Sequence, residues 1–490
     1  MAELENLKKK TFSSMIWKAM ERFCAQIVST IVSIVLARIL MPEDYSVVSI
    51  VTIFFAFCNI FISGGINSAL IQKKDADEID YSTVLITNVV ISVVLYVVMF
   101  FTAPLIARIY HKEILVPVIR VMGISFFING YKAVICAKIS SDLQFKKFFM
   151  GTIVGTIISA VVGIVMALGG LGAWALVAQQ MVNSFIDTVI LKFSTRFKFV
   201  FKFSFERFKG LFSYGGKLFL SNIITTIYNQ IKPLIVGVKY TASDLAFYKK
   251  GETFPSLINT LTSNTLAAVL FPAMSKLQDD KQAILNVVRR YLKVGSFVIF
   301  PAMLGFFAVS DNFIKIVLTE KWMPISPYLR VFCIAYMFNL IQIGNIQAIQ
   351  AIGRSDIILR IEIVKKVAYF SVIILFILFT DSPVLLAASE IICYIIATII
   401  NVYPNKKIIG FKYSYLISDL LPNLITSIIM CACVYMMNFL KINIVILLLF
   451  QILIGTFTYV VINYAVKNES LFYIIGILKS YIPNSRKRKS

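Results

Sequence analysis

One apolar stretch carries basic and hydroxyl residues at a spacing that places them on one face of a helix. In Ser213 to Gly237 the polar positions recur every three or four residues, and the residues between them are mostly Leu, Ile, Val and Phe. These positions are Lys217, Ser221, Thr225, Tyr228 and Lys232. An ammonium group inside a bilayer is costly without a partner, a cavity or a headgroup, so the stripe predicts a cavity for an anionic group. The alternative is that the two lysines snorkel to the membrane interfaces.

The same polar spacing occurs 199 positions earlier in the chain. There the stripe consists of Lys18, Arg22, Gln26, Ser29 and Ser33. A second pair of related segments, SALIQKKD and AVLFPAMS, is separated by 200 positions. Two similarities at nearly one offset predict two structurally related halves, which in transporters often meet around a central site.

A third candidate group is the set of amide side chains in the stretch 327–352. It includes Asn339, Gln342 and Asn345, and the stretch 252–275 adds Asn259. Amides offer donors and acceptors together, so they are suited to sugar hydroxyls in a wet cavity. The alternative is that they join neighbouring helices by hydrogen bonds.

The composition places these stripes in a membrane protein. The 490 residues are 59% hydrophobic and 15% charged, with a mean hydropathy of +0.83, which excludes both a soluble globular protein and a disordered chain. Segments of about 20 apolar residues predict fourteen transmembrane helices in an all-α polytopic fold. The predicted spans are 14–40, 45–71, 84–107, 114–136, 149–168, 172–192, 213–237, 252–275, 291–310, 327–352, 357–379, 383–403, 416–438 and 442–466.

The charge distribution predicts the orientation of these spans. The net charge is +23, but 23 Lys and Arg lie in six alternate connections between spans, which argues against nucleic-acid binding by a basic domain. The positive-inside rule assigns these connections to the cytoplasm, together with both termini. In the basic connection Phe193 to Gly210, Phe and Lys alternate, as expected of an interfacial segment that meets anionic lipids. Ser470 to Ile482 is a second candidate interfacial helix, and Trp322 is expected to anchor an outward connection at the interface.

The internal repeat and the connections predict four parts of the chain. They are an N-terminal bundle of six spans (1–195), a basic and aromatic linker (196–212), a second bundle of six spans (213–403), and the last two spans with a basic tail (404–490). The chain has no Walker A pattern, no HExxH, no nucleophile elbow and no cluster of metal ligands. The outward connections are too short for the catalytic loop of a lipid-linked sugar enzyme, so we expect neither enzymatic activity nor a metal site.

With these residues in view, the chain resembles the oligosaccharide flippases of the multidrug/oligosaccharidyl-lipid/polysaccharide exporter superfamily, the polysaccharide biosynthesis proteins. The resemblance rests on the segments GGINSALIQKKD, SSDLQFKKF, GLGAWALVAQQM, SDLAFYKKGETFPSLI, VLFPAMSKLQDD, EKWMPISPYL and AIGRSDIILR. It implies two six-helix bundles around a central cavity, with the last two helices appended. It also implies that the first, second, seventh and eighth spans line a cationic cavity for a pyrophosphate-linked saccharide.

Residue pattern and resemblance lead to one expected mechanism in a bacterial cytoplasmic membrane. Undecaprenyl-pyrophosphate oligosaccharide enters from the inner leaflet, and its pyrophosphate meets Lys18, Arg22, Lys217 and Lys232. Gln26, Thr225 and the four amides face the glycan. Candidates for Na+ or H+ coupling are Glu21, Glu252 and Glu390, and no other cofactor is expected. A polysaccharide polymerase and its chain-length machinery are further candidate partners.

Two other functions remain open at this stage. A cation-coupled multidrug exporter of the same superfamily would favour acidic cavity residues, and the two basic stripes argue against it. A membrane enzyme for lipid-linked sugars would need longer outward loops.

Overall fold

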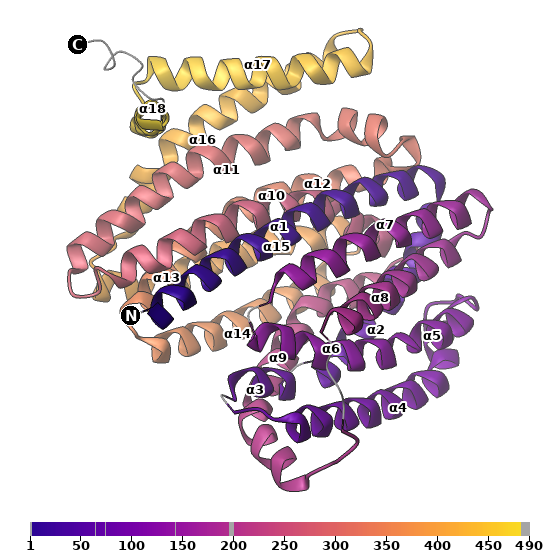
Figure 1. The fold of residues 1–490 in the computed structure, drawn as a ribbon. Coiled ribbons are helices and arrows are strands. Elements are labelled where there is room, and N and C mark those ends of the chain that lie inside the picture. Colours follow the sequence, from indigo (N-terminus) through magenta and orange to yellow (C-terminus); the bar gives the residue numbers. More distant parts are fainter. Residues whose placement is uncertain (1, 64, 74, 143, 196–199, 482–490) are drawn as a thin grey trace, which may run out of the picture. The chain divides into compact units, whose positions relative to one another are not determined.

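The computed structural model describes residues 2–63, 65–73, 75–142, 144–195 and 200–481, and these are almost entirely helical (Figure 1). The side chains of some helix residues, including Lys18 and Arg22, lie outside the described residues. Nine helical segments in the described ranges are long and apolar enough to cross a membrane. The other five predicted spans are also helical, but polar or charged residues interrupt their apolar stretches. The protein is therefore an all-α polytopic membrane protein, as the sequence predicts.

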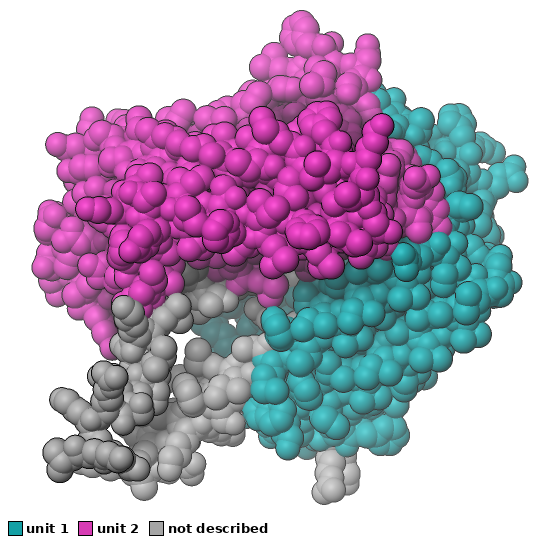
Figure 2. Space-filling view, turned by 90° about the horizontal axis from the view of Figure 1, so that it is seen from above, with its two compact units in different colours: residues 1–246 teal, residues 247–490 magenta. Residues whose placement is uncertain are grey.

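The chain divides into two compact units, residues 1–246 and 247–490 (Figure 2). The helix that carries the Lys217 stripe, α9 (Phe205–Lys239), packs against α2, α3 and α4 of the first unit. The internal repeat assigns the same stretch to a second bundle that begins at residue 213. The division into four parts stays a prediction from the sequence repeat. The two compact units follow from how the helices pack in the structure.

The first unit is built from nine helices among its described residues, with α7 lying between α1 and α8. Their bounds are α1 (Ala2–Ile39), α2 (Pro42–Ser63), α3 (Ile66–Gln72), α4 (Glu78–Ile109), α5 (Leu115–Gly123), α6 (Ser125–Ser141), α7 (Lys146–Leu168), α8 (Ala173–Thr195) and α9. Gly151, Gly155 and Gly163 allow α7 to pack closely on α8, because a Cβ at Gly151 would lie 2.5 Å from the Oδ1 of Asp187.

The second unit contains most of α10 (Ala242–Ser275) and all the later helices. Their bounds are α11 (Lys281–Val317), the 3-10 turn η1 (Glu320–Ile325), α12 (Ser326–Met337), α13 (Asn339–Ala351), α14 (Ser355–Phe379), α15 (Pro383–Ile408), α16 (Tyr413–Met436), η2 (Met437–Phe439), α17 (Ile444–Ala465) and α18 (Glu469–Tyr481). The predicted interfacial helix at 470–482 corresponds to α18. Trp322 is fully buried and packs edge-to-face against Phe247, so the prediction of an interfacial anchor at this position was wrong.

Three predicted spans are each divided into two helices. The span 45–71 is divided into α2, which ends at Ser63, and α3, which begins at Ile66. The span 114–136 breaks at Ile124, and 327–352 breaks at Phe338. At Ile124 and Phe338 the backbone N–H donates to a carbonyl three residues earlier, a 3-10 pattern that tightens the turn without ending the helical path.

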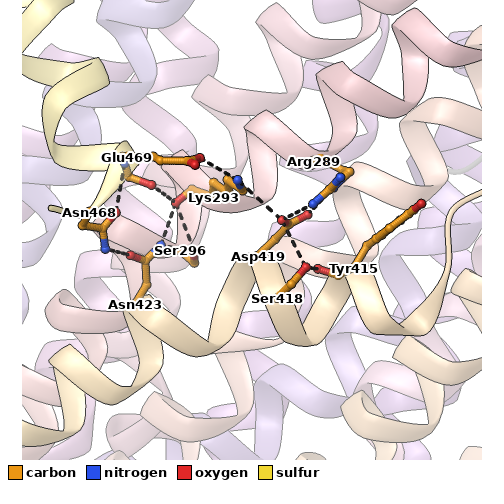
Figure 3. A network of polar contacts seen from close by, with 10 residues as sticks. Arg289, Lys293, Ser296, Tyr415, Ser418, Asp419, Asn423, Asn468 and Glu469 are labelled. Atoms are coloured by element: carbon orange, nitrogen blue, oxygen red, sulfur yellow. Dashed lines mark hydrogen bonds and ion pairs between the residues drawn. The ribbon is translucent and has the colours of Figure 1, made fainter. Parts of the chain in front are cut away.

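A polar network joins α11, α16 and α18 at one end of the second unit (Figure 3). The side chain of Asp419 is fully buried, and it accepts two hydrogen bonds from Arg289. Asn423 donates to the carbonyl of Lys293 and to Ser296, both at 2.8 Å. Lys293 donates to Glu469 at 2.7 Å, which ties the start of α18 to α11. The network satisfies polar groups that apolar packing alone would leave without partners.

Candidate functional site

The start of α9 is held by ion pairs with the N-terminal end of α4. Lys73 contacts Asp80 at 2.7 Å, and Arg207 contacts Asp80 at 3.2 Å and also pairs with Asp77. The backbone N–H of Asp80 and the Arg207 guanidinium hold the pKa of Asp77 below its ordinary value. The Asp80 side chain is fully buried, so these two cations offset the cost of burying it, and the contacts of Arg207 hold the first turn of α9 against α4.

A close backbone approach then fixes the first half of α9. A Cβ at Gly215 would lie 2.7 Å from the carbonyl carbon of Gly65, so only glycine fits at this crossing. Two residues further on, Lys217 is exposed, and the ring of Phe219 packs against Phe61 at 5.1 Å. The glycine contact therefore sets the position of α9 next to the first lysine of the stripe.

The stripe on α9 runs from exposed to buried residues. Lys217, Ser221 and Thr225 are exposed, whereas Lys232 is 3% exposed. Thr225 donates from its hydroxyl to the carbonyl of Ser221 at 2.9 Å, which leaves the hydroxyl oxygen as an acceptor. Pro233, directly after Lys232, lacks an N–H, so the helix loses one backbone bond beside the buried lysine.

The earlier stripe lies on α1, which packs against α7. The side chains of Lys18 and Arg22 are outside the described residues. Their roles in binding therefore stay predictions from the sequence. Gln26 and Ser29 are exposed. Glu21 is buried and accepts a hydrogen bond from Thr152 on α7 at 3.4 Å. The carboxylate thus faces α7, while the described polar residues of the stripe face away from the unit's interior.

The amides of the second unit form contacts between helices. Asn339 on α13 donates to Asn259 at 3.0 Å and to Ser263 at 3.3 Å, both on α10. Asn345 is fully buried, and its Oδ1 accepts from Asn405 on α15 at 2.8 Å. The Nε2 atom of Gln342 is buried without a hydrogen-bond partner among the described residues. Asn259, Asn339 and Asn345 join helices in this conformation, and the contact of all four amides with glycan stays a prediction.

Two of the acidic candidates share one neighbourhood in the second unit. Glu252 on α10 accepts a hydrogen bond of 2.9 Å from the hydroxyl of Tyr336, and Lys249 lies 3.9 Å from its other oxygen. Tyr336 meets Tyr394 edge-to-face at 6.1 Å. Glu390 lies four residues before Tyr394, one turn earlier on α15. Two carboxylates around tyrosine hydroxyls form an arrangement that can take up a proton or a small cation.

Sequence reasoning missed the tyrosines and Asn405 of these clusters. Tyr394 lies four residues after Glu390, so helical spacing alone could have paired them. Tyr336 and Asn405 lie 84 and 60 residues from their partners, and no local pattern connects such positions. Within the described ranges, no three His, Cys, Asp or Glu side chains come together as metal ligands.

A family model described as polysaccharide biosynthesis protein matches residues 35–327, which is more than half of the chain. The chain belongs to this polysaccharide biosynthesis family. It is similar to the lipopolysaccharide biosynthesis protein WzxC of Escherichia coli, with 24% identity over 76% of each chain. It is also similar to the teichuronic acid biosynthesis protein TuaB of Bacillus subtilis, with 23% identity over 72% of this chain and 74% of the relative.

The fold of this family member also has a solved counterpart. A structure of the lipid II flippase MurJ in an inward closed conformation aligns with a TM-score of 0.74 and 18% identity. The alignment covers 94% of this chain and all of that structure. The likeness establishes a common fold.

Proposed function

We propose that this family member is a flippase for lipid-linked oligosaccharide repeat units, and that it moves them across the cytoplasmic membrane by alternating access. Its family membership and its similarity to a lipopolysaccharide and a teichuronic acid biosynthesis protein support a role in surface polysaccharide assembly. The fold shared with a lipid II flippase supports a substrate on a lipid carrier, for which we propose undecaprenyl pyrophosphate. The observation that carries the proposal is the exposed cationic and hydroxyl stripe on a helix of membrane-spanning length.

The pyrophosphate is the part of the substrate that the stripes are suited to bind. Lys217 is exposed and accessible to an entering headgroup, whereas the buried Lys232 lies deeper along α9. A charge-assisted hydrogen bond to phosphate contributes about 1.5–3 kcal/mol. Lys18 and Arg22 supply the equivalent groups on α1, and Arg22 can offer the bidentate fork that lysine lacks.

The glycan is assigned to neutral polar groups. Gln26 and Thr225 are exposed and lie one or two helical turns from the proposed phosphate ligands. The sugar joined to the pyrophosphate would extend over this distance, so its hydroxyls would reach these side chains. Asn259, Asn339, Gln342 and Asn345 complete the proposed set. The buried Nε2 of Gln342 is a donor that a glycan hydroxyl could satisfy after a conformational change.

Coupling to Na+ or H+ is proposed for the carboxylates. Glu252 and Glu390 share the tyrosine cluster of the second unit, while Glu21 lies separately between α1 and α7. Protonation of Glu252 would change its hydrogen bond with Tyr336, and that bond joins α10 to α12. A cation could thus bias the packing of these two helices.

The proposal also covers orientation and partners. We propose that both termini lie in the cytoplasm of a bacterial cell, because the positive-inside rule assigns the basic connections to that side. The protein would act between the enzymes that assemble the repeat unit and a polysaccharide polymerase outside, with its chain-length machinery. Anionic lipids would meet the basic connection at 193–210, of which residues 196–199 lie outside the described residues.

The test is export in a strain that lacks the chromosomal gene. Lys217→Ala is expected to reduce surface polysaccharide per copy of inserted protein severely, and Lys209→Ala is the matched control because it removes an exposed lysine from the same helix, two turns earlier. Arg22→Ala should act like Lys217→Ala, and Arg22→Lys should restore export only in part. Normal export by both alanine variants would leave snorkelling as the explanation of the stripes.

A further inference from the structure

A groove of about 840 Å³ lies in the second unit, where α14 and α15 pack against each other near their cytoplasmic ends. Its walls are apolar. Ile357, Ile361 and Val364 follow one another at helical spacing along one face of α14, and Ile399 and Ile400 on α15 face them. Val364 is 53% exposed, so the groove opens outward from the unit. Such a surface at membrane depth would contact acyl chains.

Four cations lie on the rim of the groove. They are Lys281, Arg354, Arg360 and Lys407. Arg354 donates twice to Asp356 at 2.9 Å, so its charge is compensated. Neither Lys281 nor Arg360 forms an ion pair with a described residue, and the Lys407 ammonium lies 5.7 Å from the ring centroid of Tyr403. Three positive charges on the rim therefore have no opposing carboxylate among the described groups.

The chemistry of the groove specifies an amphiphile with an anionic head. A soluble phosphate would use the rim but would leave the isoleucine walls without an apolar partner. A lipid with a zwitterionic head would bring its own cation to a rim that is already positive. The rim residues come from three connections that the charge distribution assigns to the cytoplasmic side, the side on which anionic lipids are enriched.

We propose that this groove binds an anionic phospholipid of the cytoplasmic leaflet. Arg360 and Lys407 hold the phosphate, since they lie on the two helices that form the walls. One acyl chain lies along Ile357, Ile361 and Val364. The hydroxyl of Tyr413 donates to the carbonyl of Ile399 at 2.9 Å and keeps the start of α16 beside the groove. The groove shares no residue with the stripes or the amides, so the site does not depend on the proposed transport function.

The first test compares two double variants of equal charge. Arg360→Glu with Lys407→Glu reverses the rim, whereas Lys406→Glu with Lys412→Glu reverses two exposed lysines that do not line the groove. Native mass spectrometry of the purified full chain would measure binding of phosphatidylglycerol against phosphatidylethanolamine. We expect the rim variant to bind phosphatidylglycerol at least about tenfold more weakly, as loss of two charge-assisted hydrogen bonds predicts. The control variant and the wild type should bind it alike.

A second pair of variants tests the apolar wall without changing charge. Val364→Trp fills the groove, and Val367→Trp places the same ring at a site of 63% exposure on the same helix outside it. Only Val364→Trp should weaken phosphatidylglycerol binding. Both variants should fold, because each indole ring is added at an exposed position. Equal binding by the members of both pairs would overturn the proposal. Weakened binding of undecaprenyl phosphate alone, with phosphatidylglycerol unaffected, would also overturn it and assign the groove to the transported lipid.

Discussion

Arg289 donates two hydrogen bonds of 2.7 Å, from Nε and Nη2, to the two carboxylate oxygens of Asp419, whose side chain is fully buried. The carboxylate lies on α16 and the guanidinium on α11, so the pair joins these two helices within the second unit (Figure 3). The guanidinium also lies 4.3 Å from the ring centroid of Tyr415. The planar fork of arginine matches the carboxylate here in a way that lysine would not.

Loss of this pair should destabilise the protein more than loss of an exposed pair of the same geometry. Asp419→Ala leaves Arg289 and Lys293 without their buried counter-charge, and we expect a cost of about 2–3 kcal/mol, below the ~3–5 for fully buried pairs because Arg289 is partly exposed. The matched control is Asp356→Ala, which removes an exposed bidentate partner of Arg354 and should leave the denaturation midpoint nearly unchanged, because solvent screens an exposed pair. Thermal denaturation midpoints in detergent would measure both. Equal midpoints for the two variants would show that the buried pair does not hold α16.

The attachment of α18 should depend on pH in a defined direction. The hydrogen bond from Lys293, together with its charge, holds the pKa of Glu469 below its ordinary value of 4.5. A carboxyl with a lowered pKa contributes stability that is present above 4.5 and is lost as pH falls through the lowered value. Hydrogen exchange of the α18 amides should therefore show constant protection between about pH 8 and 5, after correction for intrinsic rates.

The same exchange measurement can test the ion pair at neutral pH. Glu469→Gln should raise exchange in α18 by up to about fivefold, because an exposed pair contributes at most ~1 kcal/mol. Exchange in α17 serves as the internal control. Unchanged α18 exchange in Glu469→Gln would mean that apolar contacts alone hold this helix.

The amides of α13 should separate into two kinds. Asn345→Ala removes the acceptor of a buried bond from Asn405, so it should lower the thermal midpoint and cost about 1–3 kcal/mol. Alanine at Asn339, Gln342 and Asn345 together is expected to reduce export of the native glycan per copy of inserted protein. Export at the level of the Asn345→Ala variant would show that Asn339 and Gln342 act only between helices.

The predicted orientation of the chain in the membrane can be tested with reporter fusions. A reporter fused after Gly210 should be cytoplasmic, and one fused after Thr241 should be external, because the predicted span 213–237 within α9 lies between the two positions. Activity of paired phosphatase and fluorescent-protein fusions would measure this. A reversed result at either position would contradict the predicted number of spans before α10.

The sequence predicts the helices well because apolar length and helical periodicity are local properties. Each of the fourteen predicted spans coincides with helical structure to within a few residues at its ends, although three of the spans contain a break. None of the three breaks within spans was predicted. The sequence has a glycine pair at 64–65 that could have indicated the first, whereas Ile124 and Phe338 are apolar residues that continue the hydrophobic pattern. The burial of Trp322 was missed because an apolar connection can pack inward as well as lie at an interface.

Candidate residues were easier to find than their partners. Lys217 and Thr225 on α9 and Gln26 on α1 were predicted from the spacing within each helix, and all three are exposed in the structure. The bonds of Glu252 to Tyr336 and of Asn345 to Asn405 join helices far apart in the chain, and only the tertiary fold brings them together.

The most direct test of the proposed function is transfer of a lipid-linked oligosaccharide across vesicles that contain the purified protein. The oligosaccharide would be extracted from the host strain, and its exposure on the far side would be measured by an added glycosidase that cannot cross the membrane. We expect exposure that depends on the wild-type protein, falls severely with Lys217→Ala, and is nearly normal with Lys209→Ala. Wild-type vesicles that expose no more oligosaccharide than protein-free vesicles would contradict the flippase proposal.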